Sequence, residues 1–112
     1  MLRAHMPFTP VYGTSEPSFD TSAFATTSHR YALESTVRTW QGPSYRSVRL
    51  VESSGAEYRV NFGTATVVAA STSCMKVLGG VEVVFTVTPD VTHIAVVSST
   101  NVTVNVTPGY GA

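Results

Sequence analysis

The feature that most limits the fold is a series of short runs, rich in valine, threonine and aromatic residues, that starts near residue 45. Apolar and polar residues alternate within several of these runs, as they do in strands that bury one face. Turn-forming residues separate the runs at a spacing of roughly ten residues, and a succession of short strands in this pattern is typical of an antiparallel sandwich or barrel. The sequence therefore predicts an all-β fold, with a small antiparallel β-sandwich, jelly-roll-like, over residues 45–112.

The first two runs, 46–51 and 58–62, predict a β-hairpin. They flank the polar segment 52–56, in which Gly55 can adopt a positive φ. The alternation places Arg49 and Arg59 on the face exposed to water. The side chains predicted to face the core are Val48, Leu50, Tyr58, Val60 and Phe62.

Further runs follow along the chain. Residues 65–70 predict a short apolar strand, followed by a loop that contains Cys74 and by a turn at 78–80. The runs 81–88, 92–98 and 102–107 predict three more strands, because β-branched residues favour strands and the segments between the runs favour turns. The residues added to the predicted core are Phe85, Ile94 and Val96.

Residues 1–44 differ from the rest in composition, since they hold most of the prolines. Proline removes a hydrogen bond from helices and strands alike, so residues 1–26 are expected to lack regular structure. The segment 28–40 fits either a helical stripe or an alternating strand, and its threonine, valine, tyrosine and tryptophan content favours a short strand at 30–40. We therefore predict an extended N-terminal arm over residues 1–44 that precedes the sandwich domain.

Aromatic residues recur along this arm, whereas disordered tails are poor in them. We interpret them as anchors that contact another surface; an unstructured terminus is the alternative. Those nearest the proline turn would also suit a cap on the sandwich or a stack on sugar rings. The predicted interface residues are Phe8, Tyr12, Phe19, Phe24, Tyr31, Trp40 and Tyr45.

Charge is scarce, because seven Lys and Arg balance seven Asp and Glu and only 12% of the residues are charged. A nucleic-acid binder needs a clustered basic surface, and no run approaches the roughly 20 apolar residues of a membrane span. A formal net charge of zero leaves little repulsion between copies. We expect a homo-oligomer with neither nucleic acid nor a membrane as partner. The first residues hold no apolar run of signal-peptide length, so synthesis in the cytoplasm is expected.

Residues with catalytic or metal-binding chemistry lack supporting spacing. His5, His29 and His93 form no ligand pair at i, i+2 or i, i+4, and Asp90 with His93 is the nearest approach to one. No nucleophile elbow or phosphate-binding glycine motif is present. Cys74 has no neighbouring base or second cysteine, so a buried small hydrophobe is expected there. We expect no enzyme, no metal site and no cofactor.

Four segments of the C-terminal half form a further pattern: FGTATV at 62–67, the two glycines at 79–80, THIAVV at 92–97 and VNVTPGYG at 104–111. Over residues 58–111 this pattern resembles short structural proteins of tailed bacteriophage particles. The resemblance implies a non-enzymatic virion protein at the capsid surface that binds and stabilises the capsid as a cement or decoration protein. Its partners would be the major capsid protein or other virion proteins, and its site of synthesis the host cytoplasm. The alternatives are a neck, tail or fibre component of the particle, or a carbohydrate-binding receptor module.

Overall fold

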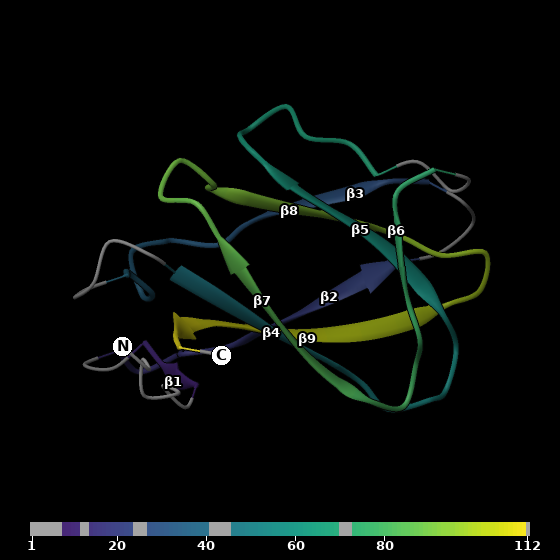
Figure 1. Cartoon of the computed structure of the whole chain (residues 1–112), viewed down its shortest axis with the longest axis horizontal. Coiled ribbons are helices and arrows are strands. Elements are labelled where there is room, and N and C mark those ends of the chain that lie inside the picture. Colours follow the sequence, from purple (N-terminus) through teal and green to yellow (C-terminus); the bar gives the residue numbers. More distant parts are fainter. Residues whose placement is uncertain (1–7, 12–13, 24–26, 41–45, 70–72, 112) are drawn as a thin grey trace, which may run out of the picture.

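A computed structural model describes residues 8–11, 14–23, 27–40, 46–69 and 73–111 (Figure 1). Within these ranges the chain forms strands and turns and no helix. The strands are β1 (Thr9–Pro10), β2 (Phe19–Ala23), β3 (His29–Ala32), β4 (Arg46–Glu52), β5 (Tyr58–Gly63), β6 (Met75–Val77), β7 (Glu82–Val87), β8 (His93–Val97) and β9 (Val102–Tyr110).

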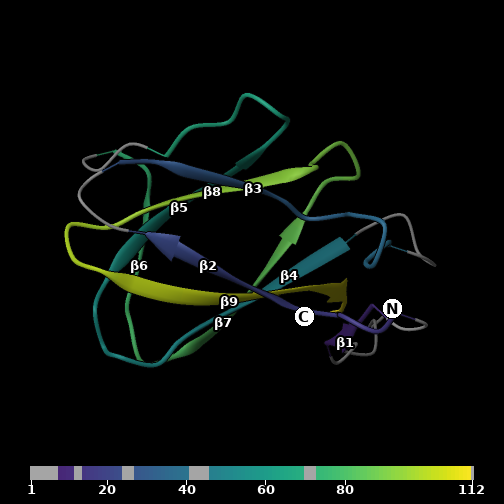
Figure 2. The same ribbon diagram turned by 180° about the vertical axis from the view of Figure 1, so that it is seen from behind.

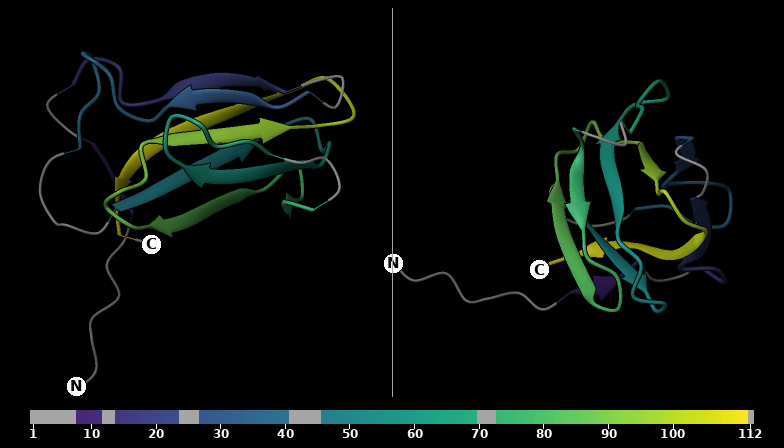
Figure 3. Two further views of the ribbon diagram at one scale, coloured as in Figure 1. Left: turned by 90° about the horizontal axis from the view of Figure 1, so that it is seen from above. Right: turned by 90° about the vertical axis from the view of Figure 1, so that its right-hand side faces the viewer.

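The strands form two antiparallel sheets that pack face to face, as Figure 3 shows from above and from the side. The first sheet has the order β1-β9-β4-β7, with β2 also paired to β9, and the second has the order β3-β8-β5-β6. Most connections carry the chain from one sheet to the other, as in jelly rolls. The prediction of an all-β antiparallel sandwich is therefore confirmed.

The predicted hairpin between 46–51 and 58–62 is wrong, although both strands exist. β4 pairs with β7 and β9, whereas β5 pairs with β6 and β8 in the other sheet. The chain crosses between the sheets after Glu52, whose buried carboxylate accepts hydrogen bonds from the backbone N–H groups of Ser54 (3.0 Å) and Gly55 (2.9 Å). Strand alternation specifies which face is apolar but not which sheet the next strand joins.

Farther along, three predicted strands are confirmed as β7, β8 and β9, and one is not. Residues 65–69 form a turn and an irregular segment, with the N–H of Val67 donating to the carbonyl of Thr64 (3.0 Å). This segment lies over the outer face of the second sheet, where Ala69 packs with Ala95 and Val97 of β8. The short strand comes later, at β6, next to the predicted Cys74 loop.

The expectation that residues 1–26 lack regular structure is wrong at β1 and β2, because both pair with β9. Figure 2 shows β2 running beside β9 along the near sheet. Thr21 points into the molecule and its hydroxyl donates to the carbonyl of Val104 (3.1 Å). β3 pairs with β8, but it ends at Ala32 rather than continuing to residue 40. The strands β1, β2 and β3 of the predicted arm thus pair with strands of the two sheets.

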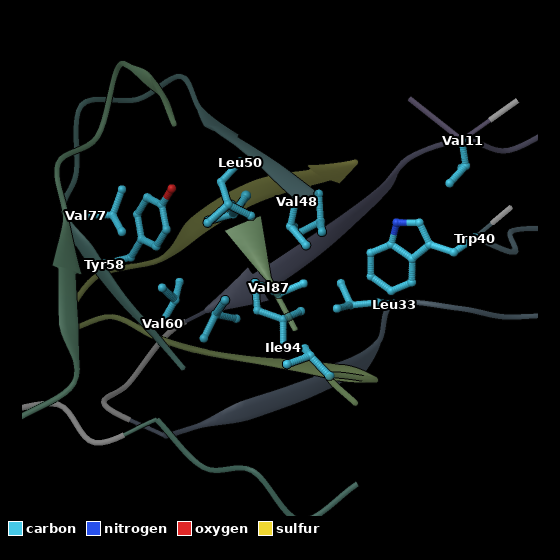
Figure 4. Close-up of a cluster of buried hydrophobic side chains, with 14 of the residues drawn as sticks. Val11, Leu33, Trp40, Val48, Leu50, Tyr58, Val60, Val77, Val87 and Ile94 are labelled. Atoms are coloured by element: carbon cyan, nitrogen blue, oxygen red, sulfur yellow. The ribbon is translucent and has the colours of Figure 1, made fainter. Parts of the chain in front are cut away.

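The core lies between the sheets, where the labelled side chains of Figure 4 converge. Val48, Leu50, Tyr58 and Val60 are buried as predicted, which confirms the alternation of β4 and β5. Ile94 and Val96 are also fully buried, whereas Phe62 and Phe85 are only partly covered and pack against each other with ring centroids 5.6 Å apart. The core is therefore complete around β8 and β9 and less covered at β7.

Candidate assembly surface

Trp40, one of the predicted interface residues, is only 7% exposed. Its Nε1 donates a hydrogen bond of 3.0 Å to the carbonyl of Gly109. The guanidinium of Arg46 lies 4.7 Å above the ring and also forms a salt bridge of 3.1 Å with Glu34. Of the roles left open for Trp40, the structure shows the cap, because its indole closes one end of its own sandwich.

Phe19 and Tyr31 join β2 to β3 along one lateral side of the sandwich. Their ring centroids lie 6.3 Å apart, and the guanidinium of Arg38 sits 4.1 Å from the Phe19 ring centroid. The Tyr31 hydroxyl accepts from the N–H of Ser22 and donates to its carbonyl, both at 3.0 Å. These two aromatics thus bridge the sheets within one chain.

Phe8 is partly buried and lies against Gly109, where an added Cβ would come within 2.7 Å of the phenyl ring. Tyr12, Phe24 and Tyr45 lie outside the described residues. The predicted interface residues that the structure describes are therefore in contact with their own domain, in the capping arrangement that the sequence also allowed.

The opposite lateral side, which we call the β6–β7 side (residues 75–87), carries three of the five large apolar residues that are exposed in the described chain; the other two, Val37 and Val68, lie on separate loops. Met75 is 45% exposed, Leu78 65% and Val81 48%. Among the described residues β7 pairs only with β4, and β6 pairs only with β5. Two strand edges and three large apolar side chains thus face outward together, and Figure 3 shows β6 and β7 away from β2 and β3. The alternation of apolar and polar residues did not predict that the β6–β7 side is exposed. Its sequence signal is the turn at 78–81, in which Leu78 and Val81 take the place of the polar residues that usually flank a turn.

The turn at the tip of this side is held in place by Glu52 and two glycines. The N–H of Gly80 donates to the backbone carbonyl of Glu52 (2.8 Å) and lies 3.3 Å from its Oε1. A Cβ at Gly79 would lie 2.3 Å from the carbonyl oxygen of Ala56, so only glycine fits there. Burial alone would raise the pKa of Glu52, but hydrogen bonds from Ser54, Gly55 and Gly80 outweigh it and hold the pKa below its usual value. Leu78 and Val81 are thus presented on a fixed turn.

The edge strand β7 leaves part of the core accessible on this side. Val83 and Phe85 point toward the core but are only partly buried. On the outer face Glu82 forms a 2.6 Å ion pair with Arg49, which places Arg49 on the wet face as predicted. A further strand against β7 would cover apolar surface as well as backbone groups.

The residues considered for metal binding or catalysis are not brought together. The carboxylate of Asp90 accepts from the hydroxyl of Thr88, and His93 Nδ1 lies 2.8 Å from the hydroxyl of Thr92. No three His, Cys, Asp or Glu side chains within the described ranges are placed to hold a metal ion. Cys74 is partly buried against the Ala69 cluster, and His5 lies outside the described residues. The part of the chain that the structure describes contains no helix long and apolar enough to cross a membrane.

The strand order and the packed layers define a small antiparallel β-sandwich. The sequence matches no protein-family model and no curated protein. Among solved structures, a chain from Bacillus endospore appendages, described as a family of disulfide-linked pili, is similar with a TM-score of 0.53. The similarity spans 99% of this chain and 96% of that one at 19% sequence identity, and it shows a shared fold.

Proposed function

We propose that this protein is a non-enzymatic structural subunit that joins a larger assembly through its β6–β7 side. The observation that carries the proposal is the coincidence, on this one side, of two unpaired strand edges in the described chain with the exposed side chains of Met75, Leu78 and Val81. An unpaired edge offers backbone donors and acceptors to another strand, and the burial of apolar side chains supplies affinity.

The charge balance supports this role, because a formal net charge of zero opposes association very little. The likeness to a chain of pili, which are structural appendages, points in the same direction. The other lateral side is less suited, since Phe19, Tyr31 and Ser22 already contact one another across it.

For the assembly itself we propose a tailed-phage virion, in which the protein decorates and stabilises the capsid and contacts the major capsid protein and copies of itself. The support is the resemblance of residues 58–111 to phage structural proteins. A second candidate is a subunit of a surface appendage, which the likeness to the pilus chain favours.

The test compares the association of the wild type with that of Leu78→Ser in sedimentation velocity experiments. Leu78 is 65% exposed, so the substitution leaves the core intact and adds no charge. Burial of a leucine contributes about 1.5–3 kcal/mol, so the variant should associate roughly ten- to a hundredfold more weakly. Val37→Ser is the matched control, because Val37 is 38% exposed on the loop after β3, away from the β6–β7 side.

Equal association of the wild type and Leu78→Ser would contradict the proposal, as would an equal loss in the control. Electron microscopy of the same samples separates the two candidate assemblies. Filaments formed by the purified protein alone would support an appendage, whereas dispersed protein that binds to undecorated capsids would support capsid decoration.

A further inference from the structure

A small hollow lies on the outer face of the second sheet, where β6, β5 and β8 run side by side. Its volume is about 90 Å³, and its lining includes Glu57, Arg59, Lys76, Val97 and Ser98. Water occupies about 30 Å³ per molecule in the liquid, so the hollow has room for a group of about three heavy atoms.

Two cations meet at this hollow. Arg59 of β5 and Lys76 of β6 are directly opposite each other in the strand register, so both side chains leave the same face of the sheet. Like charges in this position destabilise a sheet unless an anion lies between them. Glu57 supplies one carboxylate, 3.7 Å from the Lys76 Nζ in a half-exposed pair, and this leaves one positive charge over.

One hydrogen bond orients the guanidinium of Arg59. Its Nη1 donates a 2.6 Å hydrogen bond to the carbonyl of Cys74. A guanidinium has five N–H donors, and the described residues supply no second acceptor for Arg59. A planar, charged fork that is already oriented fits the two oxygens of a carboxylate.

We propose that this hollow binds a carboxylate group, with Arg59 as its principal partner and Lys76 as the second cation. Val97 also lines the hollow and adds no competing charge there. Lys76 lies in the chain between Met75 and Leu78, so a subunit seated on the β6–β7 side would be next to the hollow. The carboxylate then comes from an acidic side chain of that neighbour, a point that rests on the proposed function; a small free acid is the other source.

Binding is tested by titrating ¹⁵N-labelled protein with sodium acetate against sodium chloride at equal ionic strength. The Leu78→Ser variant is used because it keeps both cations and is expected to stay dispersed. Amide shifts should concentrate at residues 57–59, 76 and 97–99. Arg59→Gln should weaken acetate binding about tenfold or more, since hydrogen bonds to charged groups carry about 1.5–3 kcal/mol. Arg59→Lys keeps the charge but loses the fork, and should also bind more weakly.

Arg49→Gln is the matched control, because Arg49 is a cation of the other sheet already paired with Glu82. Arg59 also bonds to the Cys74 loop, so its substitution could disturb the fold as well as the hollow. Lys76→Gln is therefore a second variant, because Lys76 forms only a half-exposed ion pair. It should weaken acetate binding severalfold without a change in thermal midpoint. Acetate shifts that are scattered over the surface, or that Arg49→Gln reduces as much as Arg59→Gln, would overturn the proposal, whether or not the protein assembles.

The source of the carboxylate is read from the association of the wild type in acetate and in chloride. Weaker association in acetate identifies an acidic side chain of the neighbouring subunit as the natural occupant. Unchanged association, with acetate still bound at the hollow, assigns the site to a small free carboxylic acid.

Discussion

The indole nitrogen of Trp40 and the carbonyl oxygen of Gly109 form a hydrogen bond across 69 positions of the chain. It ties the loop that follows β3 to the last strand and closes the end of the sandwich at which Phe8 also packs on Gly109. An aromatic side chain in a proline-rich segment thus stabilises its own domain.

Trp40→Phe should destabilise the protein by about 1–3 kcal/mol in urea unfolding, because the ring volume is largely kept while the buried carbonyl of Gly109 loses its donor. Tyr31→Phe is the control. Its hydroxyl bonds to Ser22 near solvent, so water replaces the lost contacts and the cost should be smaller. An equal cost in the two variants would contradict the role assigned to the indole N–H.

Phe85→Ala should cost about 1–3 kcal/mol in the free energy of unfolding, less than the roughly 3–5 kcal/mol typical of a fully buried phenylalanine. Phe85 is only partly covered, on the edge strand β7, and a shortened side chain there leaves a space that water can enter. Ile94→Ala, at a fully buried position of β8, should cost about 2–5 kcal/mol. A larger loss for Phe85→Ala than for Ile94→Ala would show that β7 is covered in solution.

The folded protein should lose stability in acid through Glu52. Its pKa in the fold lies below the usual value of 4.5, so its contribution is fully present above pH 4.5 and is lost as the pH falls toward the lowered pKa. The thermal midpoint of Glu52→Gln should therefore start lower than that of the wild type and fall less as the pH is lowered through about 5 to 2. This interval is the ordinary titration range of carboxylates. Asp90→Asn is the comparison, because the hydrogen bond from Thr88 also lowers the pKa of this carboxylate. Its removal should flatten the acid slope in the same direction but by less than Glu52→Gln, since solvent screens an exposed group.

Tyr58→Phe should be neutral or slightly stabilising at pH 7, because the Tyr58 hydroxyl is buried and has no hydrogen-bond partner among the described residues. Burial, with a smaller effect of Glu52, raises the pKa of Tyr58 from 10.0 to about 12. Because its pKa is raised, the contribution of neutral Tyr58 to stability is fully present below pH 10 and is lost as the pH rises toward 12. The free energy of unfolding, measured over this interval, should show this loss in the wild type and should lack it in Tyr58→Phe. A destabilisation of more than about 1 kcal/mol at pH 7 would show that the hydroxyl has a partner in solution.

The strands that local sequence predicted correctly are those with strong alternation and clear turn residues. Val83, Phe85, Ile94 and Val96 repeat at every second position, and this period marks a strand wherever it lies. β2 contains Asp20 and Ser22, which face outward, and its pairing partner is β9, so no local pattern marks it. Prolines also mislead, because they disfavour strands without excluding them: Pro10 lies in the edge strand β1, and Pro108 lies within β9, which pairs on both sides.

The β6–β7 side could not be predicted from the sequence for a different reason. Aromatic residues are common at protein interfaces, and this made Phe19, Tyr31 and Trp40 attractive as anchors. Whether an aromatic side chain points outward depends on the whole topology, and here β2, β3 and β9 provide the pockets that take up these rings. Met75 is exposed on the edge strand β6, and Leu78 and Val81 are exposed on the turn that joins β6 to β7. That both strands are at sheet edges follows from the strand order, which the local sequence does not reveal.

The place of β9 also affects how the chain folds. It follows the other described strands in the sequence, yet it pairs with β1, β2 and β4, so most of the first sheet cannot form before β9 is synthesised. Contacts between such distant parts of a chain form slowly, on a scale of about milliseconds to seconds for small β-proteins. Until then β2 lacks a pairing partner and β4 lacks one of its two neighbours, and their edges are open to other chains. The open edges of β2 and β4 are covered only once the nine residues of β9 have docked, and exposed edges of this kind expose a folding chain to aggregation.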